Sequence, residues 1–337
     1  MERYINSFAT ENDIQIALQN GELLKPYVAY IEDKKRIDWN SKEILVDYAT
    51  EYLTFNITST GNINVPTGTT YSINGAEWEN TGTTLTVNSG ETIRFKGNNS
   101  AYNNNSFRDS TASFDVEGNI MSLIYGDDFK NNSTISSIFT FAGLFRNCTG
   151  LTSAEHLILP TTTLTSRCYQ NMFFTCTSLV NAPALPATTL ADRCYSSMFQ
   201  GCTSLITSPA LPATTLEYKC YSSMFESCIS LTAAPTLPAT TLIDNCYEFM
   251  FNDCISLTTA PSLPATTLAE SCYSGMFQNC TSLNYIKSLA TDISAIDCTY
   301  NWVDGVAATG TFVKASSMTS WTTDSSGIPT GWTVQDA

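Results

Sequence analysis

The stretch LPATTLADRCYSSMFQGCTSLITSPA, residues 185–210, is one of five near-identical copies that follow one another from Leu159 to Ser288. The period is 26 residues, and the copy before it reads LPTTTLTSRCYQNMFFTCTSLVNAPA. A period this regular indicates stacked supersecondary units, each burying its apolar face against its neighbours. The repeat therefore predicts a solenoid for residues 159–288, and it directs the question of function toward binding, because such arrays present long, repetitive surfaces.

Apolar residues return at the same places in every copy and predict continuous apolar columns in the stack. The columns begin at Leu159, Leu164, Met172, Phe173 and Leu179 and continue in steps of 26 residues. A proline follows the first leucine of each copy and is typical of a strand end. We therefore expect an extended segment such as Leu205–Leu211 and one or two helical turns at Cys194–Phe199.

Ten of the twelve cysteines obey the same register in two columns, which Cys298 and Cys148 extend. Metal ligands would have to converge, whereas these cysteines are spread along the stack. Disulfides between neighbouring coils, about 4.8 Å apart, are a second alternative. The third, which we favour, is that the thiols are small buried groups that fill a tight core.

The repeat pattern degrades at both ends. Residues 119–158 are expected to form an N-terminal cap and a first irregular repeat, one step of which is 28 residues long. Residues 289–337 are expected to form a degenerate repeat and a C-terminal cap that contains Trp321 and Trp332. Terminal repeats of such arrays are atypical, because they cover the exposed last unit.

This part of the chain resembles the BspA-like leucine-rich-repeat proteins of Bacteroides and related gut bacteria. The resemblance covers about residues 113–337 and rests on CTSL at Cys202–Leu205, LPATTL at Leu211–Leu216 and CYSSMF at Cys220–Phe225. It implies a right-handed leucine-rich-repeat solenoid that serves adhesion or recognition, and it implies no catalytic residues.

The first part of the chain reads differently. A short helix is expected from Asn12 to Gly21, followed by a hairpin with a strand at residues 25–33, a turn at KKR and a return at residues 37–39. Five alternating segments between residues 50 and 118 predict a small antiparallel β-sandwich. The expected fold class is thus mixed α+β: a helix and hairpin, a sandwich, and a leucine-rich-repeat solenoid with irregular caps.

Residues 1–48 hold more apolar side chains than so short a segment can bury, so we expect them to dock onto a partner. The candidate docking or oligomer surface comprises Tyr27, Val28, Tyr30, Ile37 and Trp39. The stretch Glu22–Glu43 resembles a leader segment of virion fibre and tail proteins of Bacteroides-infecting phages, including crAss-like phages. That resemblance implies attachment to virion proteins and a homo-oligomer such as a trimer.

Charge and hydropathy exclude several classes of partner. The net charge of −15 argues against nucleic acid and against an anionic membrane surface. We find no stretch of about 18 apolar residues and expect no membrane insertion. The N-terminus lacks the pattern of a secretory signal, which favours synthesis in a host cytoplasm and a final place on a virion surface. The alternative place is a bacterial cell surface.

Few residues suggest catalysis, and we expect no enzyme, cofactor or metal. The single histidine, His156, lies in the irregular first repeat without an evident partner. The acid pairs Asp127–Asp128 and Asp292/Asp297 are more typical of solvated turns than of glycosidase carboxylates. The tyrosine column that begins at Tyr169 has two interpretations, a ligand-stacking row or a structural column, and we favour the second.

Positions that change between otherwise identical copies should face solvent and could form a recognition surface. The candidates are Arg167, Arg193, Lys219, Gln200, Glu226, Asn252 and Gln278. The function expected is that of a phage virion appendage, a head or tail fibre that binds a host-surface glycan or protein through the repeats. The alternative is a BspA-like bacterial cell-surface adhesin.

Overall fold

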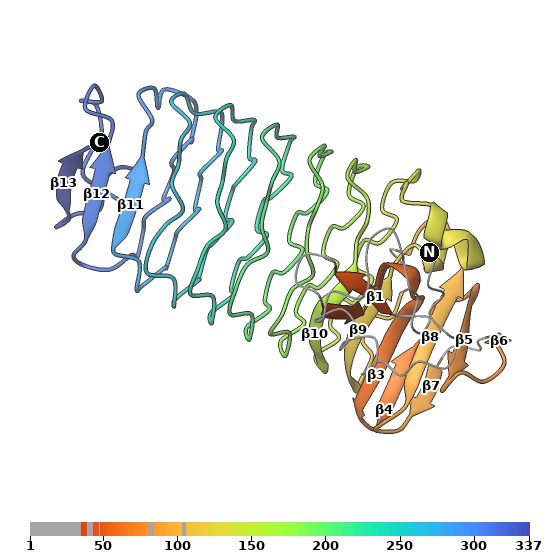
Figure 1. Ribbon diagram of the computed structural model, residues 1–337. Helices are drawn as coiled ribbons and strands as arrows, with labels where there is room; N and C mark the ends of the chain where they lie inside the picture. The colour runs from red at the N-terminus through yellow and green to blue at the C-terminus, as the bar shows by residue number, and fades with distance from the viewer. Residues whose placement is uncertain (1–34, 39–42, 47, 81–83, 103–105) are drawn as a thin grey trace, which may run out of the picture.

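The computed structural model describes residues 35–38, 43–46, 48–80, 84–102 and 106–337. A β-sheet region at the N-terminal end continues into a long stack of coils, which ends in a small sheet at the C-terminus (Figure 1). One hydrophobic core runs through both parts, from Leu53 in the sheet to Trp332 near the end of the chain.

A hairpin opens the described part of the chain. Strand β1 (Lys35–Asp38) pairs antiparallel with β2 (Glu43–Val46), and a short 3-10 helix, η1 (Tyr48–Thr50), follows. The expected turn at KKR is wrong, because Lys35 and Arg36 belong to the first strand of the hairpin. The expected helix Asn12–Gly21 and strand 25–33 lie outside the described residues.

The alternating segments become strands of a six-stranded sheet in the order β10-β9-β3-β8-β5-β6. Its members are β3 (Leu53–Ser59), β5 (Thr69–Ile73), β6 (Glu79–Asn80), β8 (Thr92–Gly97), β9 (Ser113–Asn119) and β10 (Leu151–Ile158). A separate pair, β4 (Gly61–Asn64) and β7 (Thr84–Val87), contributes the buried Ile63 and Val87. The expected antiparallel sandwich of residues 50–118 is instead this mixed sheet, which takes β10 from beyond residue 118.

Strand β9 joins the sheet to the repeats. It pairs antiparallel with β3 on one side and parallel with β10 on the other. The short helix α2 (Ser122–Tyr125) and the 3-10 helix η2 (Gly126–Asn131) follow β9. The hydroxyl of Ser122 accepts the N–H of Leu53 and donates to the carbonyl of Phe95, which fixes α2 against the sheet.

The repeats are built from consecutive turns. In the second copy the amides of Cys194, Ser196 and Met198 donate to carbonyls three residues earlier in the same copy. The intervening amides of Tyr195, Ser197 and Phe199 donate instead to carbonyls of the next copy, at 3.1, 2.9 and 3.0 Å. Half of the amides in this segment therefore close local turns, and the other half bind consecutive copies together.

The expected fold class is wrong. The described residues are mostly β and turn, α2 is their one α-helix, and no regular sheet runs along the repeats, which contain only isolated bridges such as Thr207↔Ala233. An α-helix needs right-handed dihedrals throughout, but every fourth residue here is left-handed, as at Arg193 (φ 51°), Ser197 (φ 55°) and Gly201 (φ 75°). The expected helix Cys194–Phe199 and strand Leu205–Leu211 are therefore both absent.

Two columns of aromatic rings form the centre of the stack. The tyrosine rings from Tyr169 to Tyr273 follow one another at 5.7 to 6.1 Å between centroids, all parallel or nearly so. The phenylalanine rings from Phe173 to Phe277 follow at 5.4 to 5.8 Å. These side chains are almost wholly buried, so each copy depends on both neighbours to cover its rings.

The cysteines are buried and free at all twelve positions, which confirms the burial expected from their register. Those of the second column donate Sγ–H to a phenylalanine carbonyl of the preceding copy, as from Cys202 to Phe173 (3.1 Å) and from Cys254 to Phe225 (3.1 Å). Burial raises the pKa of Cys168 and Cys280 to about 12. The thiols therefore hold neighbouring copies together as protonated donors.

The stack ends against a three-stranded parallel sheet, β11 (Tyr285–Ser288), β12 (Thr311–Lys314) and β13 (Thr333–Asp336). Trp302 takes the place of the next aromatic ring: it stacks on Tyr273 at 6.1 Å and on Trp321 at 5.6 Å. Its indole N–H donates to the carbonyl of Gly327 at 2.8 Å. The ring columns thus terminate on tryptophan and not on solvent.

Candidate functional site

Two rows of variable side chains run along the turn segment of the repeats. The cation row consists of equivalent positions in successive copies: Phe139, Arg167, Arg193, Lys219, Asn245 and Ser271. The amide row lies seven residues further along each copy: Arg146, Phe174, Gln200, Glu226, Asn252, Gln278 and Asp304. Together they contain the seven recognition residues predicted from the sequence.

The cations of the first row already have partners. Asp192 receives Arg167 at 3.5 Å and Arg193 at 3.0 Å, and Lys219 pairs with Glu248 at 2.9 Å. The guanidinium of Arg193 also lies 4.8 Å from the ring centroid of Tyr218. These contacts cross from copy to copy, so the row holds the stack together as much as it offers charge to a ligand.

The amide row is more sheltered than expected. Asn252 is buried, with only 7% of its surface exposed, and its side-chain amide donates to the carbonyl of Gln278 at 3.2 Å. Glu226 is half-buried, and desolvation, with the nearby Asp253, raises the pKa of its carboxyl group. Gln278 donates to Asp304 at 3.4 Å. The expectation that all variable positions face solvent is wrong at Asn252.

The candidate docking residues cannot be placed as a surface. Tyr27, Val28, Tyr30 and Trp39 lie outside the described residues, and Ile37 lies in β1, for which only the backbone is described.

The residues considered for catalysis are dispersed. His156 is exposed on β10 and stacks on Tyr48, with 4.4 Å between ring centroids. Asp127 accepts hydrogen bonds from Lys96 (2.8 Å) and Tyr52 (2.7 Å), which hold the pKa of its carboxyl group below its ordinary value. The tyrosine column is buried, so the ligand-stacking interpretation is wrong for it.

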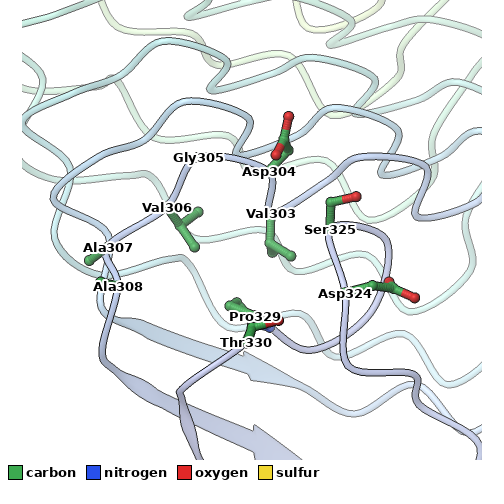
Figure 2. Close-up of a pocket in the computed structure, with 10 residues that line it drawn as sticks. All are labelled: Val303, Asp304, Gly305, Val306, Ala307, Ala308, Asp324, Ser325, Pro329 and Thr330. Atoms are coloured by element: carbon green, nitrogen blue, oxygen red, sulfur yellow. The ribbon is translucent and has the colours of Figure 1, made fainter.

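A pocket of about 210 Å³ lies beside the C-terminal sheet and is lined by residues of two segments, 303–308 and 324–330 (Figure 2). Figure 2 shows that the carboxylates of Asp304 and Asp324 point in different directions at its rim. Asp324 already accepts the amide of Ser326 at 2.8 Å. Over the described ranges, no three side chains of the types that bind metals gather at one point.

Sequence reasoning missed two apolar surface features. The prolines and alanines that end one copy and begin the next line a groove of about 510 Å³, with Pro183, Pro186, Pro209 and Pro212 among its walls. The repeated spelling APALP and SPALP could have indicated it. Ile229 and Ile255 are 39% and 42% exposed in adjacent copies, where the other copies carry threonine.

Comparison of the chain with protein-family models, with curated proteins and with solved structures finds no match. Among the residues that the structure describes, no helix has the length and apolar character needed to cross a membrane.

Proposed function

We propose that the chain is a non-enzymatic recognition protein, a phage virion appendage that binds the host surface through its stack of repeats. The docking segment of residues 1–48 would attach it to virion proteins and to further copies of the chain. The binding partner on the host would be a glycan or a protein displayed at the cell surface.

The observation that carries the proposal is the division between core and rows. Residues of the ring and thiol columns are the same in all five copies and are buried, whereas the amide row changes from Gln200 to Glu226, Asn252 and Gln278. A surface with a fixed frame and individually changeable side chains is suited to recognition. The resemblance of Glu22–Glu43 to virion fibre proteins supports the choice of a phage particle.

Two measurements on the full-length chain test the proposal. Antibodies against the chain should label purified phage particles of the source in immunogold electron microscopy, and the labelled chain should bind intact Bacteroides cells in flow cytometry. Labelling without cell binding would contradict a receptor-binding role. The absence of label from particles would contradict the appendage.

The second candidate, a bacterial cell-surface adhesin, is supported by the resemblance of Cys220–Phe225 and Leu211–Leu216 to BspA-like proteins. The two candidates differ in genetic context. A gene among capsid and tail genes would support the appendage, and a gene beside polysaccharide-uptake genes would support the adhesin.

A further inference from the structure

A pocket at the N-terminal end of the two rows brings two arginines together. Arg108 comes from the segment between β8 and β9, and Arg146 comes from the irregular coil before the first full copy. The pocket has a volume of about 180 Å³, and Phe139, Gln170 and Asn171 complete most of its wall. Phe139 begins the cation row and Arg146 begins the amide row.

Arg146 is held in place but lacks a hydrogen-bond acceptor. Its guanidinium lies over the ring of Phe174, 4.6 Å from the centroid. Its Nε is buried and has no hydrogen-bond partner. A buried charged donor without an acceptor is unfavourable, and the planar guanidinium is suited to receive a carboxylate through two parallel bonds. The side chain is thus positioned in advance for a planar anion.

The local charge favours an anion in spite of the acidic chain. Asp109 receives Arg108 at 3.1 Å and Asn147 at 2.9 Å, so its two oxygens are already engaged. Arg167 lies over the other side of the site, 5.3 Å from the ring centroid of Phe139. Arg167 in turn shares Asp192 with Arg193. Each of the two carboxylates is therefore shared with more than one cation or donor, and positive charge exceeds negative charge around the pocket.

We infer that this pocket binds the carboxylate of an acidic sugar. The two guanidinium groups would receive the carboxylate, and the side-chain amides of Gln170 and Asn171 are suited to ring hydroxyls. A volume near 180 Å³ suits one sugar residue, and the open amide row leads away from the pocket for the rest of a polysaccharide. The inference names the ligand of the recognition surface and so rests on the proposed function.

The test uses sodium glucuronate as the probe and full-length protein, with saturation-transfer NMR titrations in low-salt buffer. Wild-type protein should bind glucuronate, and Arg146→Gln should weaken binding by about tenfold or more, as expected for loss of a charged bidentate contact. Arg146→Lys keeps the charge but loses the planar pair of donors, so its affinity should lie between the two. Lys314→Gln removes one positive charge on β12, far along the chain, and should bind like wild type.

Several results would overturn the inference: no binding of glucuronate, equal binding by Arg146→Gln, or equal weakening by Lys314→Gln. Equal binding of glucose would show that the carboxylate is not recognised, and competition by sulfate as strong as by glucuronate would contradict a sugar site. If Arg146→Gln does not fold, Arg108→Gln takes its place with the same expectations.

A parallel arm measures binding of the wild-type chain to Bacteroides cells. Cell binding without glucuronate binding would refute the site and leave the proposed function standing. Glucuronate binding without cell binding would leave the site and refute the function.

Discussion

Gly275 and Phe249 occupy equivalent positions in adjacent copies, where two other copies carry Ser197 and Ser223. Both are left-handed, at φ 60° and 54°. A Cβ on Gly275 would overlap Cε1 and Cδ1 of the Phe249 ring. The large ring in one copy therefore occupies the space that the missing side chain of the next copy leaves, and the two positions should be coupled.

The overlap sets the expected magnitudes. Gly275→Ser should lower the free energy of unfolding by about 1–3 kcal/mol through overpacking, with about 1–2 kcal/mol more for a side chain in the left-handed region. Phe249→Ser alone should cost about 1–2 kcal/mol, because the ring is only half-buried. In the double variant the overlap is gone, and only the backbone cost and the lost ring contacts are left.

Urea unfolding of the four proteins, followed by circular dichroism, measures the coupling. The double variant should be more stable than the sum of the single effects by about 1–3 kcal/mol, with unchanged dependence on urea concentration as a check on the unfolding model. Ser197→Ala, at the same column in a copy without the ring, is the control and should change little. Additivity within about 0.5 kcal/mol would refute the packing argument.

Three further predictions concern the buried columns. Because burial raises the pKa of thiols such as Cys168 from 9.0 to about 12, the unfolded chain releases protons that the folded chain keeps, so stability should fall as pH rises above 9, by about 1.4 kcal/mol per thiol and pH unit; pH-dependent urea unfolding checks this, and flat stability between pH 8 and 11 would contradict it. Tyr221 has a buried hydroxyl without a partner, so Tyr221→Phe should raise stability by about 1 kcal/mol, whereas Tyr102→Phe, which removes a 2.6 Å bond to the carbonyl of Leu123, should lower it; opposite signs in thermal unfolding would disprove the assignment. Phe225, buried between Phe199 and Phe251 at 5.7 Å from each, should cost about 3–5 kcal/mol when truncated to alanine, and an effect as small as that of Thr240→Ala on the exposed surface would show that the ring column is not the core.

Burial in the repeats could be predicted from the sequence, because a column repeated in every copy must meet itself in the stack. Met198, Phe199 and Cys202 are wholly buried, as their register indicated. The segments that became β3 and β8 could also be located, because their apolar residues alternate over enough positions to specify a half-buried strand.

The conformation of the turn segment could not be predicted as easily. Its left-handed positions carry Arg193, Lys219 and Ser223 as often as glycine, so the usual glycine signal is diluted. Spacing of apolar residues at Cys194, Met198 and Phe199 also fits a helix. A signal did exist: the column of Thr175, Gly201, Ser227, Asp253 and Asn279 collects the residue types that tolerate turns.

The candidate pocket lies where the period breaks, and this explains both its existence and its absence from the sequence interpretation. Inside the array each row residue is flanked by its counterparts, so the rows close on themselves through pairs such as Lys219–Glu248. At the first irregular repeat the step from Leu151 to Leu179 is 28 residues, and the chain before it, which carries Arg108, takes the place of a preceding copy. Arg146 consequently has Phe174 on one side and a cavity on the other. A regular repeat satisfies its own polar groups, whereas a junction between a sheet and a repeat leaves donors that a ligand can use.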